Sequence, residues 1–165
     1  MNTAHWHLLL THLPIIGTIV GTSILIAGFV LKNNSTVKRT ALGVLVFSAL
    51  FAIPSFLTGE GAEEVVEDLP GVAESFIETH EELGETFLII LSILGAISIL
   101  TFIADWFKHK ATAMLYIIVL IASVATSVFT KQLANSGGEI RHTEIRADAS
   151  GAATPQEGGS EKDED

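Results

Sequence analysis

Four long apolar blocks, separated by short polar stretches, dominate the pattern of hydrophobic and polar positions. The blocks run over about residues 3–31, 40–57, 72–107 and 111–133. A helix needs about 20 mostly apolar residues to cross the hydrocarbon core of a bilayer. The pattern therefore predicts an all-α fold, a four-helix transmembrane bundle.

The polar stretches predict how the helices are connected. Residues 32–39 and 108–110 are typical of short turns, and residues 58–71 form an acidic connection between the second and third helices, interrupted by glycines and a Pro-Gly pair. The segment 147–165 is rich in Gly, Ser, Glu and Asp and has too little apolar surface to fold alone. We therefore expect a membrane domain over 1–146, ending in a short outer-face segment, and a disordered acidic tail over 147–165.

Basic residues indicate the orientation of the bundle. The turn at 32–39 carries three lysines and arginines and the turn at 108–110 carries two, whereas the chain between them has none. Short loops rich in lysine and arginine stay on the cytoplasmic side. Both turns are therefore expected in the cytoplasm, and both termini and the acidic connection on the outer face. This topology predicts a multi-pass protein of a bacterial inner membrane with periplasmic termini.

Composition narrows the classes of chemistry. The chain is 48 % hydrophobic and only 17 % charged, which is typical of a membrane domain. It has no cysteine, which excludes disulfides, thiolate metal sites, iron–sulfur clusters and haem attached through CxxCH. The formal net charge is −10, about half of it from the tail, and this argues against nucleic-acid binding.

Five of the six histidines fall at one end of the expected bundle, although they are scattered along the chain. They are His5, His7, His12, His80 and His142. The sixth, His109, lies in a cytoplasmic turn. Because an ionisable side chain at membrane depth is costly without a partner, this convergence indicates a functional site at the outer end.

Helical periodicity predicts which histidines face inward. In the third helix, His80 follows Ile77 by three residues within an apolar stripe, while glutamates cover the opposite face. In the first helix, His5 and His12 are seven residues apart and share a face, whereas His7 is rotated by about 200° from His5. We therefore predict that His12 and His80 face one another inside the bundle.

Two inward histidines on different helices are typical of haem b, whose iron accepts one imidazole on each side of the porphyrin. His12 and His80 are the predicted axial pair, with His142 or His5 as the reserve ligand. Small residues would leave room for the ring and an arginine would pair with a propionate; these residues are Gly17, Gly84 and Arg141.

A bare metal ion is one alternative. Histidines beside carboxylates suit zinc, copper or iron, and Glu60 and Glu81 are the candidate carboxylates for a site with His12 and His80. A structural role is also open, because a histidine at a helix end can bond a backbone carbonyl or lie at the membrane interface, as Trp6 is expected to do.

Four short motifs resemble a known family. They are HLPIIG, FLTGEGAEE, THEE after a Pro-Gly pair, and GGEIRHTEI. Together they resemble the small four-helix bacterial membrane proteins catalogued as domain of unknown function 2231, over about residues 5–146. Some relatives are associated with c-type cytochrome domains, so the resemblance implies a haem or electron-transfer context. By position, the family-like residues are His12, Pro14, Gly59, Glu60, His80, Glu81, Arg141 and His142.

The expected function is electron transfer by a membrane-bound, b-type cytochrome-like protein in a respiratory assembly, rather than stand-alone enzyme activity. A single haem near one face of the membrane cannot carry electrons across it. The expected partners are therefore a quinol pool and a cytochrome or larger membrane complex, besides membrane lipid. Two other functions stay open: a cofactor-free accessory subunit that packs through its GxxxG face, and a His/carboxylate metal-binding protein.

Overall fold

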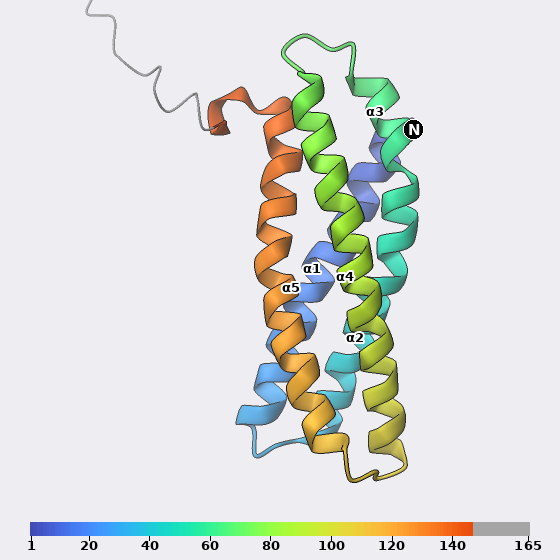
Figure 1. Ribbon diagram of the computed structural model, residues 1–165, viewed down its shortest axis with the longest axis vertical. Helices are drawn as coiled ribbons and strands as arrows, with labels where there is room; N and C mark the ends of the chain where they lie inside the picture. The colour runs from blue at the N-terminus through green and yellow to red at the C-terminus, as the bar shows by residue number, and fades with distance from the viewer. Residues whose placement is uncertain (147–165) are drawn as a thin grey trace, which may run out of the picture.

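The chain folds into an antiparallel bundle of four long helices in the computed structural model, which describes residues 1–146 (Figure 1). The long helices are α1 (Thr3–Val30), α2 (Ser35–Leu57), α4 (Glu74–Trp106) and α5 (Thr112–Arg141). Each is long and apolar enough to cross a membrane, which confirms the all-α four-helix prediction and makes the chain a multi-pass membrane protein. The acidic tail expected at 147–165 lies outside the described residues.

The helix boundaries differ from the predicted ones where polar residues extend a helix. The α2 helix begins at Ser35, within the predicted turn, because the Asn34 side chain accepts a hydrogen bond from the Val37 amide at 3.2 Å and caps it. The α5 helix continues past residue 133 to Arg141, and the Asn135 amide donates to Glu139 at 2.7 Å in this extension. Polar residues beyond the apolar block therefore remain helical at both places.

The acidic connection is partly helical, which the sequence pattern did not predict. It contains a short helix, α3 (Gly59–Val66), and the chain ends its described part with a 3₁₀ turn at Thr143–Ile145. The α3 helix packs on the start of α1, since a Cβ added at Gly61 would lie 2.6 Å from Thr3 Cγ2. This short helix therefore covers one end of the bundle.

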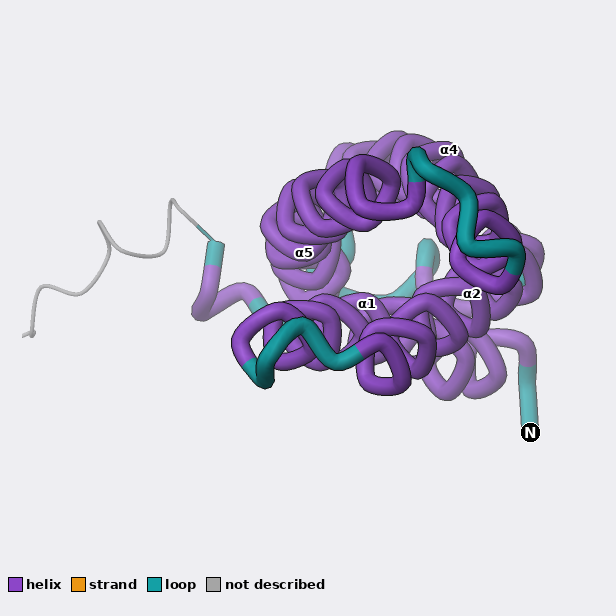
Figure 2. The backbone as a smooth tube through the Cα atoms, turned by 90° about the horizontal axis from the view of Figure 1, so that it is seen from below, coloured by secondary structure: helices purple, strands orange, loops and turns teal. Residues whose placement is uncertain are grey.

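The four long helices form a ring in the order α1, α2, α4, α5, seen along the bundle axis in Figure 2. We call the end where α1 and α4 begin and α2 and α5 end the histidine end; α3 lies there, at the top of Figure 1. The opposite end, with the turns after α1 and α4, is the basic end. In this ring α1 and α4 are diagonal to one another.

Glycines bring α1 and α2 together along most of their length. A Cβ at Gly17 would collide with Ser48 Oγ, and a Cβ at Gly21 would lie 2.9 Å from Leu45 Cδ2. The GxxxG pair is therefore occupied by packing within the chain. Gly17 does not provide room for a cofactor as predicted, and this face is not available for lateral contact with another subunit.

Gly95 allows the closest approach of α4 to α2, because a Cβ there would lie 2.5 Å from Ala49 Cβ. We expect Gly95→Ala to lower the free energy of unfolding in detergent by about 1 kcal/mol, the low end of the cost of overpacking. Gly43→Ala is the matched control, since a Cβ at Gly43 meets nothing within 4 Å. Equal melting temperatures for the two variants would show that the helices adjust without cost.

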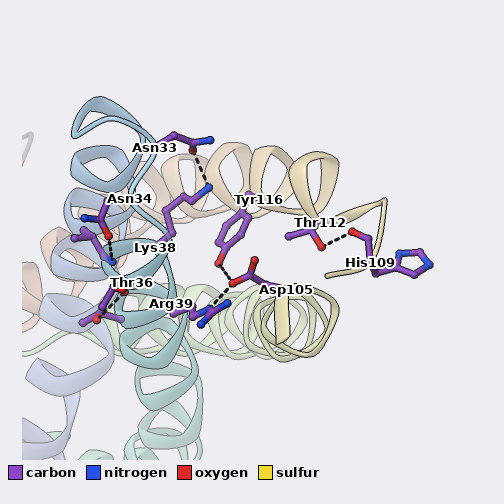
Figure 3. A network of polar contacts seen from close by, with 11 residues as sticks. Asn33, Asn34, Thr36, Lys38, Arg39, Asp105, His109, Thr112 and Tyr116 are labelled. Carbon is purple, nitrogen blue, oxygen red and sulfur yellow. Dashed lines mark hydrogen bonds and ion pairs between the residues drawn. The ribbon is translucent and has the colours of Figure 1, made fainter. Parts of the chain in front are cut away.

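A polar network joins α2, α4 and α5 at the basic end (Figure 3). The Arg39 guanidinium donates to Asp105 Oδ2 at 2.5 Å, and the Tyr116 hydroxyl donates to the same oxygen at 3.2 Å. The buried Lys38 ammonium donates to Asn33 Oδ1 at 2.7 Å and lies 4.3 Å from the centre of the Tyr116 ring. The charges of Arg39, Asp105 and Lys38 are therefore paired or held against an aromatic ring, as burial requires.

Candidate functional site

His7 and His80 meet inside the histidine end of the bundle. Their ring centroids are 6.3 Å apart and their planes are nearly perpendicular, at 88°. His80 lies on the inner side of α4, as its place in the apolar stripe predicts, and both histidines are partly buried. The pair joins the two diagonal helices α1 and α4, which make few other contacts.

The hydrogen bonds of His7 define its tautomer. Its Nδ1 lies 3.0 Å from the Ser55 carbonyl oxygen and 3.2 Å from Thr58 Oγ1. A carbonyl oxygen only accepts, so Nδ1 must carry the hydrogen. The Thr58 hydroxyl donates its own hydrogen to the Ser55 carbonyl at 2.8 Å or to the Pro54 carbonyl at 3.0 Å. Its oxygen can therefore accept the hydrogen on His7 Nδ1, which is consistent with this tautomer. In the neutral imidazole of His7 the other ring nitrogen, Nε2, is then unprotonated and carries a lone pair.

The same argument applies to His80. Its Nδ1 lies 2.9 Å from Ser136 Oγ, and that hydroxyl donates its hydrogen to the Leu133 carbonyl at 2.9 Å. With that hydroxyl hydrogen on Leu133, Ser136 Oγ accepts from His80 Nδ1–H, and Nε2 of the neutral imidazole is unprotonated. Gly137 permits this arrangement, since a Cβ there would lie 2.9 Å from His80 Cε1. Both imidazoles are thus held in one orientation with a free Nε2.

This arrangement suits metal coordination. A histidine that binds a metal through one nitrogen commonly donates its other N–H to a carbonyl or another fixed acceptor. A metal–imidazole bond of about 2 Å places two rings on one metal about 5–6 Å apart, centre to centre. The ring centroids of His7 and His80 are 6.3 Å apart, slightly beyond that range, which is close to the separation that two ligands on opposite sides of one metal would need.

The structure does not bring His12 and His80 together. His12 lies on the exposed side of α1, where its Nδ1 is 2.5 Å from the Leu8 carbonyl oxygen of its own helix. It is rotated by about 140° from His7, which takes the interior position instead. His5 is also exposed and shares a shallow depression with His12, so the two do lie on one face as predicted.

The remaining predicted site residues lie around the rim. Arg141 is exposed, and His142 is exposed with its Nδ1 2.9 Å from Glu144 Oε1. Gly84 lies one turn from His80, and a Cβ there would meet nothing within 4 Å. Glu60 and Glu81, the candidate carboxylates of the metal alternative, are both exposed. No three His, Cys, Asp or Glu side chains in residues 1–146 are grouped to hold a metal ion.

Sequence reasoning missed the residues that orient the two histidines, Ser55 and Ser136, and the residue that closes this end, Arg146. The Arg146 guanidinium donates to the Gly71 carbonyl at 2.9 Å and lies 4.1 Å from the centre of the Phe76 ring. Arg146, the last described residue, thereby contacts the start of α4 and the residues just before it. A serine followed by two glycines in a helix is the signal that could have indicated the close approach at Ser136.

Acidic side chains repel one another around the short helix α3. Partial burial, and then the charges of Glu81 and Glu67, raise the pKa of Glu63 above its ordinary value. A raised pKa in the folded state means that the protonated form stabilises the fold, and that this contribution is lost as the pH rises through that pKa. We therefore expect Glu63→Gln to raise the melting temperature slightly at pH 7 and to leave it unchanged at pH 4. A larger gain at pH 4 would contradict this.

Comparisons with known proteins leave the family of this chain open. No family model matches it, and no curated protein or solved structure matches it either. The geometry of the histidine end therefore carries the argument about function.

Proposed function

We propose that this protein is a membrane-bound, b-type cytochrome-like electron carrier that holds haem b through His7 and His80. The observation that carries the proposal is the interior pair of imidazoles, 6.3 Å apart, each with its Nδ1 hydrogen-bonded and its Nε2 free. Bis-histidine haem needs two neutral imidazoles on facing helices, with the iron between them. Of the two ligands expected from the sequence, His80 is retained and His7 takes the place of His12.

The residues around the pair fit this role. The Ser55 carbonyl and Ser136 hydroxyl hold the imidazoles in the neutral tautomer that binds iron, and such hydrogen bonds raise the basicity of the ligating nitrogen. A Cβ at Gly84, one turn from His80, would meet nothing within 4 Å, and Arg141 at the rim is available for a propionate. Haem bound here would supply one-electron redox chemistry.

The charge pattern supports one orientation. The basic end carries the positively charged turns, and the positive-inside rule places such turns in the cytoplasm of a bacterial cell. The histidine end then lies at the periplasmic face of the inner membrane. A haem at this face exchanges electrons with a quinol or a membrane partner on one side and an outer-face acceptor on the other. Since one haem does not span the bilayer, the protein acts within a larger respiratory assembly.

An absorption spectrum of the purified full-length protein tests the proposal. A Soret band, a sharp α-band on reduction and one haem per chain by pyridine haemochrome assay are expected. Stoichiometric zinc or copper without a Soret band would replace haem by a bare metal ion at the same histidines. Neither haem nor metal, with co-purification of a larger complex, would overturn the proposal in favour of a cofactor-free accessory subunit.

A further inference from the structure

The interior of this membrane bundle is unusually rich in hydroxyl groups. Ten serines and threonines are buried within residues 1–146, and they come from all four long helices. Their positions are Thr18, Thr22, Ser48, Ser55, Ser98, Thr101, Ser123, Thr126, Thr130 and Ser136. Small hydroxylated residues allow close packing of membrane helices, so their number alone does not indicate a function.

The α5 helix shows the pattern most clearly. Five of its seven buried residues carry a hydroxyl group, whereas large apolar residues such as Ile117, Ile121 and Val128 are exposed. The helix is therefore apolar outside and polar inside. The hydroxyl series begins at Ser136, which is bonded to His80, and continues through the other buried positions of α5 toward Tyr116, which is bonded to Asp105.

The α4 helix continues the series at the basic end. Its buried face carries Ser98 and Thr101, followed by Asp105 one turn later. Ser98 is seven residues from Asp105, and Ser123 is seven residues from Tyr116 on the antiparallel neighbour. Because Tyr116 and Asp105 are in contact, Ser98 and Ser123 lie at the same level of the bundle. We call Ser136, Thr130, Thr126 and Ser123 of α5, with Ser98 and Thr101 of α4, the hydroxyl column.

Ser98 supplies an independent sign that something else occupies this interior. Its side chain is fully buried, and its Oγ is the only such buried side-chain polar atom in the described residues without a hydrogen-bond partner. A buried hydroxyl without a partner loses the free energy of its hydration, so native proteins place a partner or a water molecule there. Most other column hydroxyls donate to a carbonyl of their own helix, which leaves their oxygen lone pairs available to water.

We propose that the hydroxyl column, together with bound water, conducts protons between Ser136 at the histidine end and Asp105 at the basic end. Successive hydroxyls along one helix are three, four or six residues apart, which is about 4.5–9 Å at 1.5 Å per residue. One or two water molecules span each interval, because hydrogen-bonded oxygens lie about 2.8 Å apart. The column therefore runs through the same length of the bundle whose outer surface is apolar and faces lipid.

The proton balance closes without any further reactant. At the histidine end, Ser136 Oγ accepts a proton from a water molecule and passes its own proton to the next oxygen. Each oxygen of the column and each bridging water then accepts one proton and passes on another, so that no net charge is left behind. At the basic end the Asp105 carboxylate accepts the proton and releases it beside Arg39, whose side chain is 38 % exposed.

Proton flux into vesicles tests this proposal. The full-length protein is reconstituted in liposomes that enclose a pH-sensitive dye, and a potassium gradient with valinomycin sets the membrane potential. We expect the wild type to acidify the vesicles faster than protein-free liposomes do. Thr126→Val and Ser98→Ala should reduce the flux to that of protein-free liposomes, because each removes an oxygen from the column.

Matched variants separate conduction from packing. Thr40 also donates to a carbonyl of its own helix, at 3.1 Å, but is exposed, so Thr40→Val should keep the wild-type flux. The stability of Ser98→Ala provides a second test. If no water is bound to the Ser98 hydroxyl, the variant is more stable than the wild type and its proton flux is unchanged. That result overturns the proposal. Wild-type flux equal to that of protein-free liposomes also overturns it. The proposal is independent of haem, since conduction by a protein without a Soret band would contradict only the electron-transfer function.

Discussion

Replacing His80 with leucine is expected to abolish the Soret band of the purified protein while leaving its membrane insertion unchanged. Leucine is close to histidine in size and is apolar, so it retains packing against Gly137 but supplies no ligand nitrogen. The iron would then have one axial ligand in an interior site with little other affinity for it. The measurement is the haem content per chain, from the haemochrome spectrum and the protein concentration in detergent.

The other histidines of α1 provide matched controls for this result. His7→Leu should remove the low-spin, bis-histidine spectrum in the same way, because His7 is the second interior imidazole. His12→Leu should keep the wild-type spectrum, because His12 lies on the exposed side of the same helix. The opposite result, with the spectrum lost in His12→Leu and retained in His7→Leu, would restore the pairing expected from the sequence and reject the one proposed from the structure.

Replacing Asp105 with alanine is expected to cause the largest loss of stability among the polar substitutions. The Asp105 carboxylate is 15 % exposed and accepts hydrogen bonds from Arg39 on α2 and Tyr116 on α5. Its removal leaves a guanidinium and a buried phenol without their acceptor, which costs more than the lost pair contributes. We expect the melting temperature in detergent to fall by about 5–10 °C.

Two further variants divide this effect between its causes. Asp105→Asn keeps an acceptor oxygen for Tyr116 but removes the charge that Arg39 faces, so it should cause a smaller fall in melting temperature. Tyr116→Phe removes the hydroxyl without changing the ring that lies near Lys38. If Asp105→Ala melts at the wild-type temperature, water replaces the carboxylate and the network does not hold the three helices together.

Particular residues show why the sequence predicted one interior histidine and not the other. The part of α4 that holds His80 carries glutamates on its opposite side, so the contrast between apolar and charged faces identifies the inner face. The α1 helix is apolar on all sides, because lipid and the bundle interior are both apolar. Its hydrophobic periodicity therefore does not indicate which side faces inward.

A different signal in α1 does indicate the inner face. His7, Pro14, Gly21 and Gly28 are spaced by exact steps of seven residues, and the last three are buried against other helices. In membrane helices small residues, rather than large apolar ones, mark the side that packs on a neighbour. The stripe of small residues therefore predicts His7, and not His12, as the interior imidazole.

The sequence by itself determined the number of long helices, the two polar ends and the inner face of α4, because each depends on local contrasts between apolar, charged and small residues. Only the tertiary structure decided how closely His7 approaches His80, and that Ser55 and Ser136 hold the two imidazoles. These contacts join residues 48 and 56 positions apart in the chain. They depend on how closely the glycines let α1 approach α2 and α5 approach α4, and that distance is a property of packed helices and not of any one of them.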